Sequence, residues 1–196
     1  MNHLILTADK LIAGVDEVGR GPLAGPVVAA AVILDPERSI PGLTDSKKLS
    51  NKKREYFALQ IQENAYAIGI GSADVHEIDK VNILQATFLA MQRAISDLGC
   101  SPGRVLVDGN QCPELSCTVE AIINGDCLEP AISAASIIAK VHRDNLMYDF
   151  DKEFPDYGFA GNKGYPTREH INALNALGPT RIHRRSFKPV ANCLGQ

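Results

Sequence analysis

The sequence predicts an α/β protein in which helices flank a mixed β-sheet and a helical part follows at the C-terminus. Apolar segments with the length and composition of buried strands come first, and helices and strands alternate after them. From residue 131 onward the periodicity indicates helices. At 196 residues the chain is long enough to form one sizeable core.

Two nearly continuous apolar segments, 11–16 (LIAGVD) and 27–34 (VVAAAVIL), predict buried strands near the N-terminus. The segment that joins them, EVGRGPLAGP, contains glycines and prolines that exclude a helix. A third strand is expected over 65–72 (AYAIGIGS). Before it, Ser50 is suited to cap a helix that reaches about residue 64. Lysines in the first turn of this helix oppose its dipole, so they indicate a purpose other than helix stability.

The middle of the chain predicts a helix over about 82–98, because its apolar side chains recur at four-three spacing along one face. These side chains are Leu84, Phe88, Met91, Ile95 and Leu98. Gly99 suits the position just past the end of that helix. Short strands are expected at 104–108 (RVLVD) and at 117–123 (CTVEAII), the second of them before an Asn124-Gly125 turn.

The last part of the chain predicts two helices. The first covers 131–150 and has a face of small side chains, formed by Ala131, Ala134, Ala135 and Ala139. The second covers about 167–177 and ends at Gly178-Pro179.

Composition excludes several classes of protein. Hydrophobic content of 45% and charged content of 22% are ordinary for a globular protein. No apolar run approaches the roughly 20 residues of a transmembrane helix, and MNHLILTADK has no signal-peptide pattern. We therefore expect a cytoplasmic protein without membrane association. The five cysteines form no close CxxC pair and the five histidines are scattered, so a thiol or imidazole metal site is not expected.

The net charge of −3 hides two basic clusters. The first comprises Lys47, Lys48, Lys52, Lys53 and Arg54, and the second comprises Arg181, His183, Arg184, Arg185 and Lys188. Either cluster alone is more often a solvated face than a binding site. Together with acidic residues between them they suggest a nucleic-acid substrate, because a phosphate backbone needs cations around the acidic site that cuts it.

Acidic residues follow several of the predicted strands. Asp16 ends one buried strand and Asp108 ends another, so parallel pairing of these strands would place both carboxylates at one edge of the sheet. Alternation points Glu17 away from Asp16, although Gly19 allows the chain to turn. Asp126 follows the Asn124-Gly125 turn. Each acid by itself is more often a turn or cap residue, and this alternative stays open for Glu17 and Asp126.

Carboxylates that cluster without thiol or imidazole partners suit hard cations such as Mg²⁺ or Mn²⁺. Two such ions about 4 Å apart can activate an attacking water and stabilise the leaving oxygen of a phosphodiester. The acids therefore favour a metal-dependent phosphodiesterase.

The segment from Gly19 to Gly25 must be tested against a dinucleotide-binding fingerprint, since Gly19, Gly21 and Ala24 fit GxGxxG/A. The fingerprint needs a helix directly after it, but prolines interrupt this segment and a strand begins at Val27. A Walker loop is excluded because no Gly-Lys-Ser/Thr follows. Two readings stay open: a glycine loop whose backbone approaches a nucleic-acid strand, with Arg20 as a cationic anchor, or a tight connection only.

Six segments of the chain have the character of family motifs. They are 16–25 (DEVGRGPLAG), 45–49 (DSKKL), 108–109 (DG), 133–140 (SAASIIAK), 163–167 (KGYPT) and 183–187 (HRRSF). In order and in spacing they resemble those of bacterial ribonuclease HII, and the resemblance covers essentially the whole chain. The first and fourth segments are long and specific.

The resemblance implies a ribonuclease H-like fold in one domain over 1–196. About 1–150 would be the catalytic core, and about 151–196 a helical extension that completes the substrate cleft. The implied activity is endonucleolytic cleavage of the RNA strand in RNA–DNA hybrids and of single ribonucleotides embedded in duplex DNA. The implied cofactors are two Mn²⁺ or Mg²⁺ ions when substrate is bound.

The resemblance also implies roles for individual residues. The metal-binding catalytic acids would be Asp16, Glu17, Asp108 and Asp126. The residues that contact the ribose 2′-hydroxyl would be Gly19, Arg20 and Gly21, and Tyr165 would sense the junction between RNA and DNA. The residues with phosphate or metal-shell contacts would be Lys47, Ser133, Ser136 and Lys140.

The mechanism expected from this set is in-line hydrolysis that leaves 3′-hydroxyl and 5′-phosphate ends. We expect a monomer, because no apolar stripe is left over. The C-terminal sequence NCLGQ shows no clear clamp-binding peptide. Two other classes remain as alternatives, a non-catalytic hybrid-binding module and a cofactor-dependent oxidoreductase, and the missing helix after Ala24 argues against the second.

Overall fold

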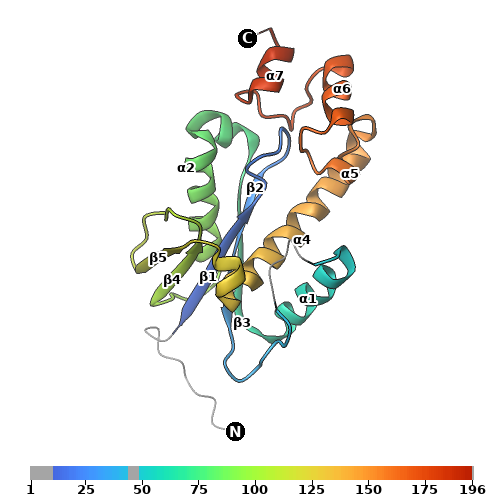
Figure 1. Cartoon of the computed structure of the whole chain (residues 1–196). Helices are drawn as coiled ribbons and strands as arrows, with labels where there is room; N and C mark the ends of the chain where they lie inside the picture. The colour runs from blue at the N-terminus through green and yellow to red at the C-terminus, as the bar shows by residue number, and fades with distance from the viewer. Residues whose placement is uncertain (1–10, 44–48, 196) are drawn as a thin grey trace.

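The computed structural model describes residues 11–43 and 49–195, and within them five strands form one sheet in the order β3-β2-β1-β4-β5 (Figure 1). The strands are β1 Ile12–Val18, β2 Val27–Leu34, β3 Ala65–Ala73, β4 Arg104–Asp108 and β5 Thr118–Ile122. Each lies where the hydrophobic pattern predicts a strand, with ends that differ by one or two residues. The predicted α/β class is therefore confirmed.

The sheet is mixed, as the sequence predicts. β1 pairs antiparallel with β2, and β2 pairs antiparallel with β3. β4 runs parallel to β1 on its other side, and β5 runs parallel to β4. The register places Val15 opposite Val107, so Asp16 and Asp108 follow on neighbouring parallel strands. The expected meeting of these two carboxyl ends at one edge of the sheet is confirmed.

Helices cover both faces of the sheet, which explains why β2 is apolar at every position. Ala29, Ala31 and Ile33 share one core cluster with α2 (Val75–Ser96). Ala30 and Val32 point to the opposite face, where they share a second cluster with the helices on that side. Those helices are α1 (Asn51–Asn64) and α4 (Pro130–Glu153). Figure 1 shows α2 on one side of the strands and α1 and α4 on the other.

Glycines allow the helices to lie very close to the strands. A Cβ atom on Gly14 of β1 would lie 2.1 Å from the carbonyl carbon of Ala131 in α4. A Cβ atom on Gly71 of β3 would lie 2.2 Å from the carbonyl oxygen of Ala90 in α2. The strand that carries Asp16 is therefore in backbone contact with the helix behind it.

The helix expected at 82–98 begins earlier, at Val75, after a capping box between Asp74 and Glu77. Asn82 interrupts it with a φ of 69°, and the Asn82 side chain accepts hydrogen bonds from the amides of Leu84 and Gln85. Asn82 therefore acts as a second cap inside one continuous element. The apolar periodicity detected the part after this kink and missed the part before it.

The C-terminal part is helical, as predicted, but it contains more elements than the sequence pattern indicates. Thr167 caps α6 (Arg168–Leu177), which matches the expected helix. The additional short elements are η3 Pro155–Tyr157, α5 Phe159–Asn162 and α7 Lys188–Cys193. Among the described residues, no helix combines the length and apolar character needed to cross a membrane.

The contact between β1 and α4 can be tested with a pair of glycine substitutions. We expect Gly14→Ala to lower the free energy of unfolding by about 1–3 kcal/mol or more, because the new methyl group overlaps the α4 backbone. A Cβ atom on Gly161 of α5 meets no heavy atom within 4 Å. Gly161→Ala should therefore be neutral or stabilise by up to about 1 kcal/mol. Urea denaturation of both variants measures the difference, and equal stabilities would contradict the close contact.

Candidate metal centre and substrate cleft

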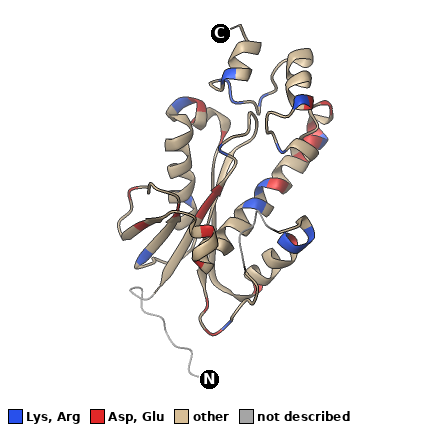
Figure 2. Ribbon diagram, viewed as in Figure 1, with Lys and Arg blue, Asp and Glu red and all other residues tan. Residues whose placement is uncertain are grey.

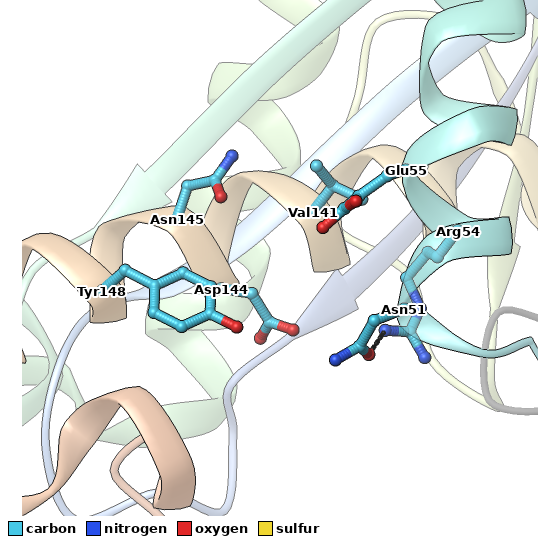
Figure 3. A pocket seen from close by; sticks show the side chains of 7 residues that line it. All are labelled: Asn51, Arg54, Glu55, Val141, Asp144, Asn145 and Tyr148. Carbon is cyan, nitrogen blue, oxygen red and sulfur yellow. Dashed lines mark hydrogen bonds between the residues drawn. The ribbon is translucent and has the colours of Figure 1, made fainter.

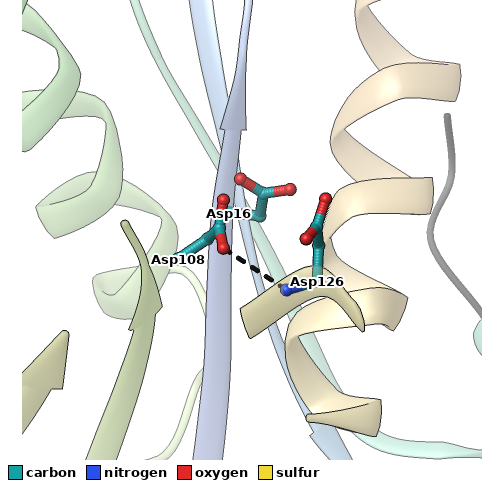
Figure 4. A group of neighbouring side chains, drawn as sticks. All are labelled: Asp16, Asp108 and Asp126. Atoms are coloured by element: carbon teal, nitrogen blue, oxygen red, sulfur yellow. Dashed lines mark hydrogen bonds between the residues drawn. The ribbon is translucent and has the colours of Figure 1, made fainter. Parts of the chain in front are cut away.

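Three aspartates bring their carboxylates together where β1 and β4 end (Figure 4). Asp16 comes from β1, Asp108 is the last residue of β4, and Asp126 lies in the short helix α3 (Gly125–Leu128). One oxygen from each carboxylate lies within 4.8 Å of the other two. Oxygen donors at this spacing fit a hard divalent cation.

Each of the three aspartates is held by neighbouring groups. The carboxylate of Asp16 accepts the amide hydrogen of Glu17 at 2.7 Å and a hydrogen bond from the Ser136 side chain. The carboxylate of Asp108 accepts the amide hydrogen of Asp126 at 3.3 Å. The hydroxyl of Ser133 donates to the carbonyl oxygen of Asp126. The two serines, both buried on α4, thus fix the backbone or side chain of an acid.

The expected turn before Asp126 is in fact the start of α3. Asn124 adopts the left-handed conformation with a φ of 57°, and Gly125 follows in close packing. A Cβ atom on Gly125 would lie 2.6 Å from Ile132 Cδ1 and 3.4 Å from Asp108 Oδ1. The absence of a side chain at Gly125 therefore allows Asp126 to lie beside Asp108.

Burial makes the acidic cluster electrostatically unfavourable without a cation. The pKa of Asp16 is raised to about 8, first by burial and then by the negative charge of Glu17. The pKa of Glu17 is also raised by burial, while Arg20 opposes that shift. A positive ion between these groups would relieve both the desolvation and the mutual repulsion.

Glu17 lies beside the three aspartates and is not part of their close group. Its carboxylate pairs with Arg20 at 3.3 Å, and its side chain keeps 15% of its surface exposed. The negative charge of Asp108 still contributes to its raised pKa, so the two carboxylates are within electrostatic reach. The structure therefore brings three of the four predicted acids together and places the fourth at their margin.

A cleft of about 120 Å³ opens next to Asp16. Its lining side chains come from β1, α1, α4 and the C-terminal part, and they are Asp16, Glu17, Val18, Arg54, Ser136, Lys140 and Tyr165. Among the predicted substrate contacts, Ser136, Lys140 and Tyr165 thus border the cleft. Ser133 is not in this lining, and its hydroxyl donates to the backbone carbonyl of Asp126. Lys47 falls outside the described residues. Lys140 pairs with Asp144 at 2.6 Å.

The glycine loop, residues 19–25, is held by hydrogen bonds from the buried guanidinium of Arg184. This group donates to the carbonyl oxygens of Gly19 at 2.5 Å, of Arg20 at 2.9 Å and of Gly25 at 2.8 Å. In a planar trans peptide the N–H points opposite to the C=O. The amides of Arg20 and Gly21 therefore point away from Arg184, and both residues are exposed.

A second buried guanidinium, that of Arg143 on α4, holds the other end of the same loop. It donates to the carbonyl oxygens of Ala24, Pro26 and Lys163, each at 3.0 Å. Gly19 has a φ of +94°, and a Cβ atom there would lie 2.2 Å from Arg143 Nε. Glycine is thus required at position 19 both for its conformation and for its contact.

Only some side chains of the C-terminal basic cluster are exposed on the surface. His183 and Arg184 are buried, so the expectation that this cluster offers its charges to nucleic acid is wrong for these two residues. Figure 2 shows other Lys and Arg residues on α1 and α4. Sequence reasoning missed the roles of Arg143 and Arg184, because a charge count cannot tell a buried arginine from an exposed one.

Tyr165 is placed beside the glycine loop by backbone pairing. The amide of Leu23 donates to the carbonyl oxygen of Gly164 at 2.7 Å. Gly164 has a φ of +82°, and a Cβ atom there would lie 2.6 Å from the carbonyl oxygen of Ala24. The Tyr165 ring, 41% exposed, lies 3.5 Å from the position of a Cβ on Gly21. The loop and the tyrosine thus form one continuous side of the cleft.

Arg54 of α1 is a further residue at the site, which sequence reasoning placed only in a general basic cluster. Its guanidinium donates to Asn51 Oδ1 at 2.9 Å and to the carbonyl oxygen of Leu49 at 3.0 Å. Arg54 borders both the cleft and a small neighbouring groove between α1 and α4. Figure 3 shows this groove, with Asn51, Arg54 and Glu55 on one side and Val141, Asp144, Asn145 and Tyr148 on the other.

Comparison with known proteins agrees with this geometry. Residues 13–190 match the family model described as Ribonuclease HII. The chain is 58% identical to the ribonuclease HII of Aliivibrio fischeri (strain MJ11) over 186 residues, which cover 95% of this chain and 90% of the relative.

Two solved structures have the same fold. The ribonuclease H2 of Pyrococcus horikoshii OT3 is 27% identical, with a TM-score of 0.76 over 93% of this chain and 96% of that one. The ribonuclease HII in the PCNA:RNase HII complex from Archaeoglobus fulgidus is 26% identical, with a TM-score of 0.77 over the same shares. The family match spans the strands, the acidic cluster and the C-terminal helices described above. The chain belongs to the ribonuclease HII family.

Proposed function

We infer that this chain is an endoribonuclease that hydrolyses the RNA strand of RNA–DNA hybrids and cuts duplex DNA at embedded ribonucleotides. The observation that carries this inference is the cluster of Asp16, Asp108 and Asp126 at the edge of parallel strands, in a chain that matches ribonuclease HII along its length. A buried acidic cluster beside exposed backbone amides suits a substrate with both phosphates and ribose hydroxyls.

The donor set fits divalent metal ions, and we propose Mn²⁺ or Mg²⁺, with two ions when substrate is bound. Asp16, Asp108 and Asp126 would hold the ions, and Glu17 would supplement them. The support is the spacing of the three aspartate oxygens and the raised pKa of Asp16, which indicates a carboxylate that lacks a compensating charge. When bound, such ions supply an activated water as nucleophile and stabilise charge on the leaving oxygen.

The protein's own part in the reaction is to hold ligands and substrate in fixed positions. The Glu17 amide and the Ser136 side chain orient the Asp16 carboxylate, and Ser133 fixes the backbone at Asp126. Rigid positioning of this kind keeps the reacting groups in line for hydrolysis that leaves 3′-hydroxyl and 5′-phosphate ends.

Recognition of ribose is proposed to come from the glycine loop. The amides of Arg20 and Gly21 point away from the buried Arg184 guanidinium, so they are available to donate to an acceptor in the cleft. Gly19 and Gly21 leave room for close backbone approach. A 2′-hydroxyl oxygen is the acceptor that distinguishes a ribonucleotide from a deoxyribonucleotide.

The remaining contacts are proposed from their place around the cleft. The flat, half-exposed ring of Tyr165 suits a sugar or base where RNA changes to DNA. Ser136 and Lys140, which border the cleft, are proposed to contact phosphate or groups next to the metal ions. Ser133 shares this proposal through its hydrogen bond to the Asp126 carbonyl, and the exposed Arg20 is proposed to contact the substrate beside Gly19 and Gly21. Lys47 shares the phosphate proposal on the family motif alone.

We also propose that one chain forms the working enzyme, with about 1–150 as catalytic core and about 151–196 as the extension that completes the cleft. The support is that two residues of the proposed extension reach the core: Arg184 donates to the glycine loop, and Tyr165 borders the cleft. The archaeal relative was solved with PCNA.

The activity can be tested with a DNA duplex that carries one ribonucleotide, in the presence of Mn²⁺ or Mg²⁺. We expect a nick on the 5′ side of that residue. Asp108→Asn should lower turnover by about 10³-fold or more and leave hybrid binding within about twofold, because a ligand charge is lost while the basic surface stays. Gel analysis of the products and fluorescence anisotropy with labelled hybrid measure the two effects.

The matched control is Asp149→Asn, the same chemical change at an exposed aspartate on α4 that pairs with Lys152. It should cut at the parental rate. An intact duplex with the parent protein would contradict the activity, and undiminished cutting by Asp108→Asn would contradict the role of Asp108.

The raised pKa of Asp16 predicts a pH-dependent effect of Asp16→Asn on stability. The pKa rises from 3.8 to about 8 on folding, so the metal-free protein loses stability as pH increases between these values. Asparagine stays neutral, so the melting temperature of Asp16→Asn should match the parent near pH 4 and exceed it by several degrees at pH 8.

Calorimetry in a chelating buffer across this pH range measures the effect, with Asp149→Asn as control. Mn²⁺ at pH 8 should then raise the melting temperature of the parent and leave that of Asp16→Asn nearly unchanged. Parallel pH profiles for Asp16→Asn and the parent would contradict the account.

A further inference from the structure

Two buried histidines outside the metal centre contact each other through their ring nitrogens. His170 of α6 and His183 of the following segment are almost completely buried, at 0% and 2% exposure. Their Nε2 atoms lie 3.0 Å apart. At this distance one nitrogen carries a hydrogen and donates it to the other.

The groups at either end of the pair decide which nitrogen donates. The backbone amide of Thr180 donates to His183 Nδ1 at 2.9 Å, so this nitrogen is an acceptor and the proton of His183 is on Nε2. At the other end, His170 Nδ1 lies 2.9 Å from the carbonyl oxygen of Tyr165. A carbonyl only accepts, so His170 carries its proton on Nδ1.

The two histidines therefore form a one-way chain of hydrogen bonds, which we call the histidine relay: Thr180 N–H to His183, His183 to His170, and His170 to the carbonyl of Tyr165. Every member is neutral in this arrangement. A second proton on His170 would place its Nε2–H against the Nε2–H of His183 at 3.0 Å. A second proton on His183 would place Nδ1–H against the Thr180 amide at 2.9 Å.

The surroundings of the relay keep it neutral. Burial lowers the pKa of His170, and burial together with His170 lowers the pKa of His183 to about 4. The Tyr157 ring lies 5.2 Å from His183, and its hydroxyl donates to the carbonyl of Gly178. Phe159 covers His170 edge-on at 5.3 Å. Arg184 directly follows His183 in the sequence, but its guanidinium donates to the glycine loop and not to the histidine pair.

The relay ends on the backbone of the residue whose ring borders the cleft. Lys163 and Gly164, which precede Tyr165, both have positive φ angles of 52° and 82°. Two consecutive left-handed residues persist only where surrounding contacts hold them. The carbonyl of Tyr165 receives hydrogen bonds from His170 and from the Thr167 amide at 2.8 Å. These contacts fix the peptide from which the Tyr165 ring projects toward Gly21.

We propose that His170 and His183 are positioning residues that hold Tyr165 against the glycine loop and so set the preference for junctions between ribonucleotide and deoxyribonucleotide. This inference rests on the proposed function of Tyr165 as the residue that contacts the junction. A pair of apolar side chains could fill the same space, but it could not donate to the carbonyl of Tyr165.

Two substitutions of His170 separate positioning from packing. In His170→Asn the amide nitrogen takes the place of Nδ1 and still donates to Tyr165, whereas His170→Leu fills space without a donor. Both leave His183 Nε2–H without its acceptor, so both are destabilised. The measurement is kcat/KM on a single-ribonucleotide duplex divided by kcat/KM on an RNA–DNA hybrid.

We expect His170→Leu to lower this ratio roughly tenfold, mainly through KM for the single-ribonucleotide duplex, because a displaced contact residue weakens one substrate selectively. His170→Asn should keep the ratio within about twofold of the parent. In a Tyr165→Ala background, His170→Leu should cause no further loss of the ratio, since two residues that act through one contact are not additive.

Leu174→Ala is the matched control for destabilisation, because Leu174 is buried on α6 one turn beyond His170 and is not part of the relay. It should lower stability and leave the ratio unchanged. ¹⁵N NMR of the parent at neutral pH should show the Nδ1–H form of His170 and the Nε2–H form of His183.

Equal losses of the kcat/KM ratio in His170→Asn and His170→Leu would overturn the relay, and so would an equal loss in Leu174→Ala. The opposite tautomer at either histidine would overturn it as well. A Tyr165→Ala protein with the parental ratio would instead contradict the proposed function of Tyr165 itself. Additive losses in the double variant, with Tyr165→Ala alone effective, would contradict the relay and leave that function standing.

Discussion

The burial of Asp16 beside further carboxylates, where the pairing of β1 with β4 ends, is the constraint on which the site depends. Parallel pairing brings Asp16 and Asp108 together, and Gly125 lets Asp126 join them. The raised pKa of Asp16 shows what this arrangement costs in the absence of a cation. A divalent ion that binds at this cluster relieves the unfavourable burial of negative charge, so its binding stabilises the fold. The surrounding structure holds the carboxylate ligands in place.

The second requirement is a rigid loop beside this cluster, and two buried arginines provide it. Arg143 comes from α4 and Arg184 from the C-terminal part, so core and extension are joined through the carbonyl groups of the glycine loop. Each guanidinium loses its water on burial and instead donates hydrogen bonds to backbone carbonyl oxygens. The Arg184 contacts turn the amides of Arg20 and Gly21 outward, which links the packing of the C-terminal part to the proposed recognition of ribose.

The sequence predicts the sheet and its acidic edge well, because continuous apolar segments and strand ends are local signals. Asp16 and Asp108 could be paired from strand order, whereas Asp126 could not, since its place depends on a short helix and on the close packing of Gly125 against Ile132. Arg143 and Arg184 lie among ordinary helix and loop residues, and their carbonyl partners between Gly19 and Pro26 are more than a hundred positions away. Such long-range contacts between side chain and backbone leave no periodic signature in the chain.

The account as a whole requires divalent ions at the aspartate cluster. The most direct measurement is anomalous scattering from crystals grown with Mn²⁺ near neutral pH. The account predicts a manganese peak in contact with Asp16 and with at least one of Asp108 and Asp126, at distances of about 2.0–2.4 Å. Saturating Mn²⁺ with no peak at these carboxylates, or with peaks only elsewhere on the surface, would contradict it.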